Sequence, residues 1–386
     1  MVNRLFRERQ MNILFCGSNA PQELDTQLHY LSAAANRYQY RFMQALSEQG
    51  HSVEVFSYIG FPLEDGGREA ILGGQTPFPV HYVFKQENLP DTLRECRRTL
   101  REQLREADIA FAYNSLYAWF LLPKLCKKSG KQSVLILADY SGPESYHSLP
   151  RKLYARLMLH NIRKYDVVVG LSEQTKRYLT RKQRFLCSEG GIDKAFYDRF
   201  AVLPERCGDR KIFMYAGILE KVTGLDLLLE AFMQLPDAGC ELRISGKGSM
   251  EETVREAARK DPRIKYLGFL AYEEYLGCLE QADVLVNPRN MHMEENRNNF
   301  PSKIMEYLAT GREILSTRFV GWEKFGANVT FCDSDARAMR EALTQCGLNV
   351  EKNREVRYTQ NREFALSYLW QEQIKRIIKF IGGNYV

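Results

Sequence analysis

The chain has 386 residues, of which 45% are hydrophobic and 26% charged, and its formal net charge is +6. These values are typical of a folded globular protein, the length favours two domains, and so mild a positive excess does not indicate binding to nucleic acid. Nine scattered cysteines without a C-x-x-C pair predict a reduced protein of the cytoplasm. We expect neither a signal peptide nor a membrane span, because no apolar run approaches about 18 residues.

In the first half of the chain, short apolar runs alternate with helical patterns such as residues 36–50. The apolar runs predict strands at 11–17, 52–58, 80–84, 108–114, 133–139 and 166–172. Continuous apolar strands separated by helices are typical of a parallel sheet that is covered on both faces. The polar stretch 198–210, which contains a proline, then predicts a linker.

The same alternation begins again after this linker. Further strands are predicted at 211–217, 240–245, 263–269, 282–289, 312–317 and 329–333. Helical patterns separate most of them, and the last pattern, 364–383, predicts one long amphipathic helix. We therefore expect an α/β protein of two doubly wound, Rossmann-like domains, 11–203 and 208–362, which face a cleft. Ligands of such sheets bind beyond the carboxyl ends of the strands.

The segment FPSKIMEYLATG, residues 300–311, predicts a short helix with two different faces. At about 100° of rotation per residue, Ser302, Lys303 and Glu306 share one face and the apolar residues share the other. A lysine at the amino end of a helix conflicts with the helix dipole, and an arriving anion would remove that conflict. The alternative is a capped helix whose acid pairs locally with its lysine.

Three loops that follow strands of the second half are candidates for the same site. They are 215–224 with Lys221, 245–250, and 286–303, which leads into the helix just described. Backbone N–H groups at a helix terminus, together with two lysines, would bind a diphosphate without a metal ion. For Lys221 taken alone, a solvated loop lysine is the more ordinary interpretation.

Other motifs remain open on the sequence alone. Asp139 ends a predicted strand, where its side chain would enter the cleft, but a turn aspartate before Gly142 is equally plausible. The D-x-D motif at 333–335 sometimes holds a metal ion, although a helix N-cap is the favoured interpretation here. GKGSME, residues 246–251, is only a weak dinucleotide fingerprint.

Residues 151–184 carry ten lysines and arginines against two acids, mixed with leucine, methionine and tyrosine. A basic amphipathic face suits an anionic membrane surface. The alternative is an ordinary helix that packs on a sheet and has a basic outer side. Of the two, we expect that residues 151–184 bind an anionic membrane surface.

The motifs together resemble the large retaining glycosyltransferase family 4, which has the two-domain GT-B architecture. The resemblance covers nearly the whole chain and is strongest from Tyr215 to Thr317, where ISGKGSMEETVREAARK, ADVLVNPR and FPSKIMEYLATGREILST follow the order of the family. It implies that 11–203 is the acceptor-side domain and that 208–362 binds the nucleotide-sugar donor. It also implies that the final helix, 364–383, packs back on the first domain.

The resemblance assigns a role to each candidate residue. Glu306 resembles the acid that binds the ribose of the donor, and Lys303 and Asp139 are the catalytic candidates. The expected diphosphate contacts are Gly17, Lys221, Ser302 and Lys303. The expected base pocket is Gly246, Lys247, Gly248, Phe269 and Leu270, and the expected sugar contacts are Asn298, Asn299 and Phe300.

The sequence departs from the family pattern at two positions. Asn298 stands eight residues before Glu306, where the family often has a second glutamate, and Ile218 follows Gly217, where it often has arginine. These departures leave two hypotheses open. The first is a metal-independent enzyme without a cofactor that transfers a hexose, from a UDP-sugar rather than a GDP-sugar, to a sugar acceptor. This acceptor would be lipid-linked, at the inner membrane face, as in capsule or exopolysaccharide synthesis. The alternative is a catalytically silent nucleotide-sugar-binding partner protein.

Overall fold

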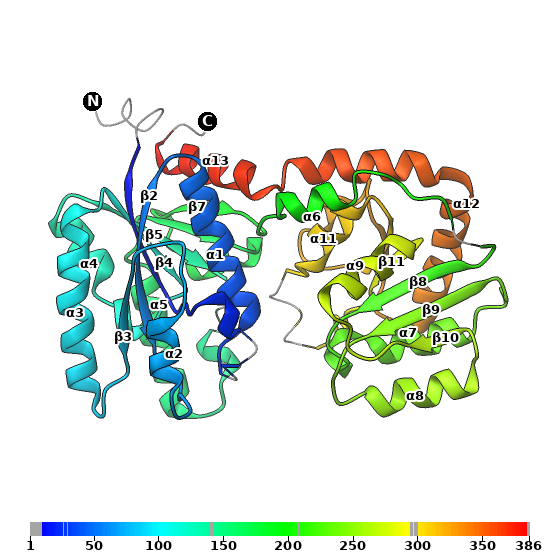
Figure 1. Ribbon diagram of the computed structural model, residues 1–386, viewed down its shortest axis with the longest axis horizontal. Helices are drawn as coiled ribbons and strands as arrows, with labels where there is room; N and C mark the ends of the chain where they lie inside the picture. The colour runs from blue at the N-terminus through cyan, green and yellow to red at the C-terminus, as the bar shows by residue number, and fades with distance from the viewer. Residues whose placement is uncertain are drawn as a thin grey trace. The chain divides into compact units, whose positions relative to one another are not determined.

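The structure is a computed structural model that describes residues 10–383 except 26, 29, 139, 141, 207, 294, 295 and 297–299. It divides into two compact units (Figure 1). One unit comprises the chain up to Gly190 together with the residues from Trp370 onward, and the other comprises Gly191–Leu369. Among the described residues, no helix is both long and apolar enough to cross a membrane.

The first unit contains a seven-stranded sheet with the order β3-β2-β1-β4-β5-β6-β7, in which every neighbouring pair is parallel. Its strands are β1 (Asn12–Gly17), β2 (Ser52–Ile59), β3 (Val80–Phe84), β4 (Ile109–Tyr113), β5 (Gln132–Leu137), β6 (Val167–Gly170) and β7 (Arg184–Cys187). Its helices are α1 (Ala33–Glu48), α2 (Gly67–Gly73), α3 (Leu89–Glu106), α4 (Leu122–Lys128), α5 (Leu149–Ile162) and α13 (Trp370–Ile381).

The second unit contains a six-stranded parallel sheet with the order β10-β9-β8-β11-β12-β13. Its strands are β8 (Lys211–Ala216), β9 (Cys240–Ser245), β10 (Ile264–Tyr266), β11 (Val284–Asn287), β12 (Glu313–Thr317) and β13 (Thr330–Cys332). Its helices are α6 (Lys194–Arg199), α7 (Leu225–Met233), α8 (Glu251–Lys260), α9 (Tyr272–Gln281), α11 (Lys303–Thr310) and α12 (Ala336–Leu366).

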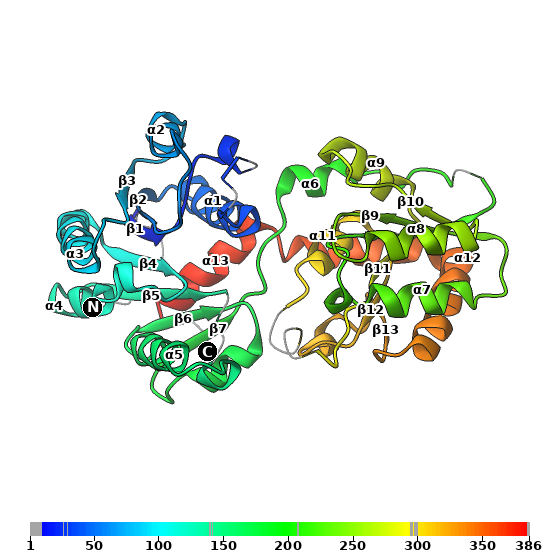
Figure 2. The same cartoon turned by 90° about the horizontal axis from the view of Figure 1, so that it is seen from below.

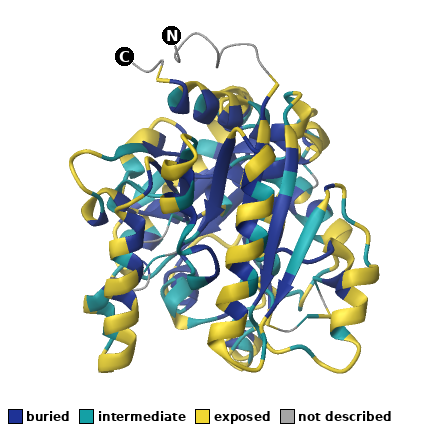
Figure 3. Ribbon diagram, turned by 90° about the vertical axis from the view of Figure 1, so that its left-hand side faces the viewer, coloured by how far each residue is buried: buried dark blue, intermediate teal, exposed yellow. Residues whose placement is uncertain are grey.

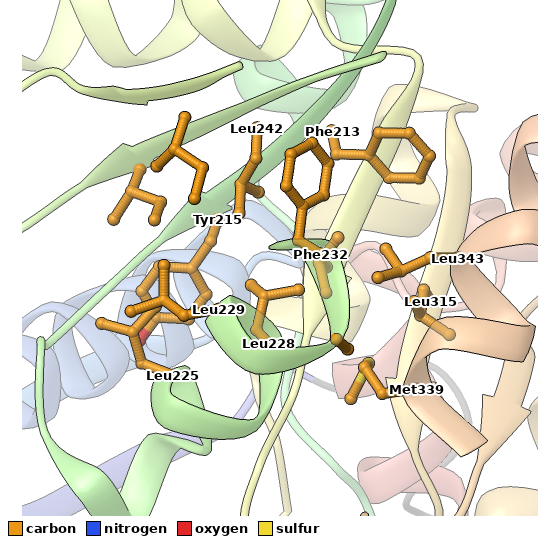
Figure 4. Close-up of a cluster of buried hydrophobic side chains, with 14 of the residues drawn as sticks. Phe213, Tyr215, Leu225, Leu228, Leu229, Phe232, Leu242, Leu315, Met339 and Leu343 are labelled. Carbon is orange, nitrogen blue, oxygen red and sulfur yellow. The ribbon is translucent and has the colours of Figure 1, made fainter. Parts of the chain in front are cut away.

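Each sheet is buried between two helical layers, as the continuous apolar strands predict. In the first unit, α1 and α13 share one core cluster with the sheet, and α3 and α4 share the other (Figure 2). Most strand residues of the first unit are buried, although β3 at the edge of its sheet is only half-buried along its first residues, and the helices are exposed on their outer sides (Figure 3). In the second unit, leucines of α7 pack against Phe213 of β8 and Leu242 of β9 (Figure 4).

The strand order places a switch point in each sheet. The chain leaves β1 toward β2 on one side and later returns to place β4 on the other side, and β8 has the same position between β9 and β11. Doubly wound sheets bind ligands beyond the carboxyl ends of the strands at such a point. Gly17, at the end of β1, and Gly217, directly after β8, occupy these two positions.

Two expectations about the chain's course are wrong. The segment 364–383 is not one helix, because α12 ends at Leu366 and α13 begins at Trp370. Leu369 forms a bridge with Ile192 instead, and the Ile192 N–H donates to the Tyr368 carbonyl at 2.7 Å. The chain also leaves the first unit at Gly190, before the predicted boundary at 203.

The early boundary has a packing reason. Phe196 of α6 and Phe200, which follows α6, are buried in the same cluster as α11, so they belong to the second core. Their local pattern is short and polar, and it gives no sign of the distant helix that covers them. Trp370 and Ile374 of α13 are buried in the first unit, in one cluster with Phe42 of α1.

Candidate functional site

The loops after β8 and β9 are joined backbone to backbone at the carboxyl edge of the second sheet. The Gly217 N–H donates to the Ser245 carbonyl at 2.9 Å, and the Leu219 N–H donates to the Lys247 carbonyl at 2.9 Å. Tyr215, from β8, donates its hydroxyl hydrogen to the Ile218 carbonyl at 2.6 Å. The first two candidate loops therefore form a single rigid surface.

The glycines of this surface are required by the close approach of the two loops. A Cβ atom at Gly246 would lie 1.7 Å from the Gly217 oxygen, and one at Gly248 would lie 2.3 Å from the Leu219 oxygen. No side chain fits in either place without moving the backbone. The G-x-G pattern that weakly resembled a dinucleotide fingerprint thus has a packing cause, and its role in a base pocket stays a prediction.

Helix α11 has the two faces that its sequence predicts. Ser302 and Glu306 are exposed and Lys303 is half-buried, whereas Ile304 and Tyr307 are fully buried. Ser302 is the N-cap residue, but its side chain makes no capping hydrogen bond. The polar face of the helix is therefore confirmed, and the Ser302 hydroxyl is not used to close the helix.

Glu306 is not the only group that interacts with the Lys303 ammonium, although the capped-helix alternative assumes a local pair of these two side chains. Its ammonium group donates to the carbonyl of Ala216, the last residue of β8. Burial lowers the pKa of Lys303, while Glu306 opposes this effect and Arg289 adds to it. Lys303 is thus a cation held at the switch point of the sheet with part of its hydration removed.

Arg289 is a functional candidate that the sequence analysis missed. It lies two residues beyond β11, the strand beside β8, and it is half-buried. Burial lowers the pKa of Arg289, and its Nη1 lies 3.4 Å from the Asn296 side-chain oxygen. The sequence offered one signal for Arg289, a basic residue in the loop that follows an apolar strand. The same signal singled out Lys221.

Lys221 starts a short 3-10 helix, Lys221–Thr223, and its side chain is exposed. Gly224, with φ +72°, follows, and a Cβ atom there would lie 1.6 Å from the Pro288 carbonyl oxygen. The backbone that carries Lys221 therefore rests directly against the backbone that leads to Arg289. The three candidate loops converge on one edge of the sheet, as expected.

The other predicted contacts of the second unit have different surroundings. The Glu306 carboxylate accepts a hydrogen bond from the Tyr275 hydroxyl at 3.3 Å. The Lys247 ammonium lies 4.6 Å from the ring centre of Phe269, which is 68% exposed, and Leu270 is half-buried beside it in the sequence. Phe269 therefore offers an open aromatic face with a cation on it.

The predicted sugar contacts are only partly described. Asn298 and Asn299 lie outside the described residues. The Phe300 ring packs against Phe319 and Phe325, with ring centres 5.4 and 5.9 Å away. The Phe300 side chain thus belongs to an aromatic cluster. Any contact of Phe300 with a sugar would therefore come from its backbone.

In the first unit, Gly17 leaves no room for a side chain, because a Cβ atom would lie 2.2 Å from the Gln39 side-chain oxygen. Asp139 lies outside the described residues, but its neighbour Ala138 donates its N–H to the Asn114 side chain at 2.9 Å. Asn114 has φ +58° at the end of β4. The ends of β4 and β5 are therefore tied together next to the Asp139 position.

The D-x-D motif is used for capping, as favoured. The Asp335 side chain accepts from the Ala338 N–H at 2.8 Å and starts α12, and Asp333 pairs with Arg318. The Ser334 hydroxyl donates to the Arg289 carbonyl at 3.1 Å. The motif thus fixes the start of a helix and supports the loop that carries Arg289.

Comparison with known families matches both halves of the chain. Residues 35–186 match the family model described as Glycosyltransferase Family 4, and residues 210–347 match the one described as Glycosyl transferases group 1. A relative, "Putative colanic acid biosynthesis glycosyltransferase WcaL" of Escherichia coli (strain K12), is 27% identical over 175 residues. The match covers 42% of this chain and 42% of the relative, so it spans less than half of the relative's length.

Solved structures with the same fold cover both units. Anabaena Alr3699/HepE in complex with UDP has a TM-score of 0.70 at 14% identity, and the match covers 97% of this chain and 100% of that one. The lipopolysaccharide outer core galactosyltransferase WaaB has a TM-score of 0.68 at 14% identity, with 97% and 100% covered. These likenesses confirm the predicted GT-B fold class of two parallel-sheet α/β domains. The two family models match in chain order, one in each half of the chain. The protein therefore belongs to the glycosyltransferases that these two models describe.

Proposed function

We propose that this protein transfers a hexose from a nucleotide sugar to an acceptor hydroxyl, with retention of configuration. The observation that carries the proposal is the pair of cations, Lys303 and Arg289, held half-buried at the switch point with the exposed Glu306 beside them. Two like charges brought together out of water favour a ligand that carries more than one negative charge. A nucleoside diphosphate has that charge. The hydroxyls of its ribose can donate hydrogen bonds to a carboxylate such as that of Glu306.

The fold relatives support a uridine donor. The structures of Anabaena HepE contain UDP, UDP with glucose, and UDP-glucose. We therefore propose a UDP-sugar rather than a GDP-sugar as donor. Lys303 would bind the diphosphate, and Glu306 would bind the ribose. The further proposed contacts are Gly17, Lys221 and Ser302 to the diphosphate, Gly246, Lys247, Gly248, Phe269 and Leu270 to the base, and Asn298, Asn299 and Phe300 to the sugar.

The reaction requires stabilisation of the leaving group more than any other assistance. The bond from the anomeric carbon to the diphosphate breaks, the acceptor oxygen bonds to that carbon, and the proton of the acceptor hydroxyl passes to the departing diphosphate. Negative charge grows on the diphosphate as its bond breaks, and cations already in place stabilise that charge most in the transition state. Lys303 and Arg289 would supply this effect without a metal ion, and Asp139 is the proposed contact to the sugar or the acceptor.

The first test is release of the nucleotide. We expect UDP release from UDP-glucose or UDP-galactose, faster than GDP release from GDP-mannose, and unchanged turnover in excess EDTA. Complete loss of turnover in EDTA, restored by Mg²⁺ or Mn²⁺, would return the D-x-D motif to consideration. A raised melting temperature with UDP-sugars but no release would favour the silent binding protein, an alternative consistent with Ile218, which is 66% exposed where the family often has arginine.

We also propose that α5 of the first unit binds an anionic membrane surface, where a lipid-linked sugar acceptor would be presented. The relative WcaL is named for colanic acid biosynthesis, which supports an acceptor of the surface-polysaccharide kind. Leu149, Leu153 and Leu157 recur every four residues along α5 and are 73%, 64% and 48% exposed. Arg156, which at about 100° per residue lies on the same side of the helix as these leucines, is exposed as well.

This surface combines the two features that hold a helix at a lipid interface. An exposed leucine that enters the acyl boundary gains roughly 1.5–3 kcal/mol, and each nearby cation adds about 1 kcal/mol on an anionic leaflet. The buried side of α5 carries Ala155, Met158 and Ile162, and Ile162 belongs to a core cluster of the first sheet, so the exposed leucines are not needed for that contact. The protein would therefore act at the inner membrane face.

The membrane proposal is tested by replacing Leu153 and Leu157 with serine together. We expect vesicle binding to fall at least about tenfold, because the lost burial exceeds about 1.4 kcal/mol. Cosedimentation with anionic and neutral vesicles at two salt concentrations measures it. Leu348→Ser on α12, where the leucine is 40% exposed, is the matched control. Equal binding to both lipids, or equal loss in the control, would contradict the proposal.

A further inference from the structure

A small, largely enclosed cavity lies at the amino ends of the strands in the second unit, around the starts of β11 and β12. The space open to the centre of a water-sized sphere is about 10 Å³, room for one such sphere. Its lining residues are Leu203, Asp283, Gly311, Arg312, Glu313, Asn349, Val350, Arg354 and Arg357. The cavity is therefore small, largely enclosed and lined by several charged side chains.

Both carboxylates of this cavity are already paired. Glu313 accepts from Arg357 Nε at 2.8 Å, and also from Thr330 and Asn349. Asp283 accepts from the Ile212 N–H at 3.0 Å and lies 3.3 Å from Arg206 Nε and 3.9 Å from Arg354 Nε. Three partly buried guanidinium groups, those of Arg206, Arg354 and Arg357, thus lie against two carboxylates, and the buried Arg312 is a fourth cation in the same cluster.

Arg312 is the guanidinium without a carboxylate partner in this cluster. It is 3% exposed, and its Nη2 donates to the Glu280 carbonyl. Within the described residues, its Nε and Nη1 are buried without a hydrogen-bond partner, and so is Arg354 Nε. An unpaired buried donor is costly, and an uncompensated buried charge is costlier still.

The charge of Arg312 persists at neutral pH. Burial, with Arg354 next in effect, lowers the pKa of Arg312 to about 10, which leaves the guanidinium protonated. A water molecule in the cavity would satisfy its donors but not its charge. A negative atom in the same place would do both.

We propose that this cavity binds one monatomic anion of the halide class, with chloride as the abundant candidate, held by the unpaired donors of Arg312 and Arg354. A halide ion is only slightly larger than a water molecule, whereas phosphate, sulfate and carboxylates are several atoms wide, so a halide is the anion closest in size to this space. This anion site is separate from the proposed donor site. Arg312 comes just after the carboxyl end of α11, whereas Ser302, Lys303 and Glu306 lie at or near its amino end. The proposal therefore predicts a second ligand for the same unit.

The decisive measurement is anomalous diffraction from crystals equilibrated in sodium bromide. We expect a bromide peak within hydrogen-bond distance of Arg312 Nε or Nη1. In solution, the melting temperature should rise with chloride and level off, measured against sodium gluconate at equal ionic strength. A cavity that holds only water in bromide would overturn the proposal.

Arg312→Gln should abolish the saturable rise with chloride. Arg259→Gln is the matched control, because Arg259 is a 65% exposed arginine that pairs with Glu252, and it should keep the full rise. If Arg312→Gln does not fold, Arg354→Gln replaces it, since that residue also contributes an unpaired donor. An unchanged chloride response in either cavity variant would contradict the site.

Discussion

Replacing Lys303 with alanine is expected to lower kcat about 10²–10³-fold, the usual cost of removing one preplaced donor to a developing negative charge. The structure gives the reason. The ammonium group is anchored by the Ala216 carbonyl and is held half-buried, so it is in place before the diphosphate begins to leave. Because its contact strengthens as that charge grows, kcat should fall more than donor affinity does.

The lost anchor could also lower stability, so the melting temperature must be measured with the kinetics. Lys265→Ala, at an exposed lysine of β10, is the matched control and should leave kcat unchanged. A lower melting temperature for Lys303→Ala with unchanged kcat would identify Lys303 as a structural residue and remove it from the proposed site.

Glu306→Gln is expected to raise the donor KM about ten- to a hundredfold and to change kcat much less. The ribose hydroxyls keep their charge throughout the reaction, so an interaction with them stabilises the bound substrate and the transition state alike. A hydrogen bond to a charged group contributes roughly 1.5–3 kcal/mol, which corresponds to this change in KM. Steady-state kinetics with varied donor concentration measure it.

Tyr275→Phe separates the binding role of Glu306 from a structural one. It removes the hydroxyl that donates to the Glu306 carboxylate and leaves that carboxylate in place. If the tyrosine bond were the purpose of Glu306, both variants would lower the melting temperature alike and leave the donor KM unchanged. A raised KM in Glu306→Gln, with a smaller change in Tyr275→Phe, supports nucleotide binding.

Local patterns predicted what depends on local physics. The apolar runs predicted the parallel strands given above except β7, and the period of α11 predicted that Ser302 and Glu306 are exposed while Ile304 is buried. The cap at Asp335 followed from its residue type and its place before a helix. Each of these features is determined by residues within a few positions of one another.

Features set by distant partners could not be predicted. The helical period continues through residues 367–369, yet Leu369 pairs with Ile192, which is far away in the sequence. Phe300 is not distinguished from a sugar contact until Phe319 and Phe325 are placed around its ring. Arg289 gains its importance from Lys303, a neighbour across the fold. The candidate site is thus predictable as a set of loops, but the environments of its side chains are not.

The divided first unit has a consequence for the order of synthesis. Its residues up to Gly190 leave the ribosome before the second unit, but α13, which buries Trp370, Ile374 and Ile377 against α1 and the sheet, leaves after it. Until the whole second unit has been translated, that apolar layer has no cover and exposes hydrophobic surface, which favours association with chaperones or with other nascent chains. The second unit, Gly191–Leu369, is continuous and contains all of its own core before the first unit can close.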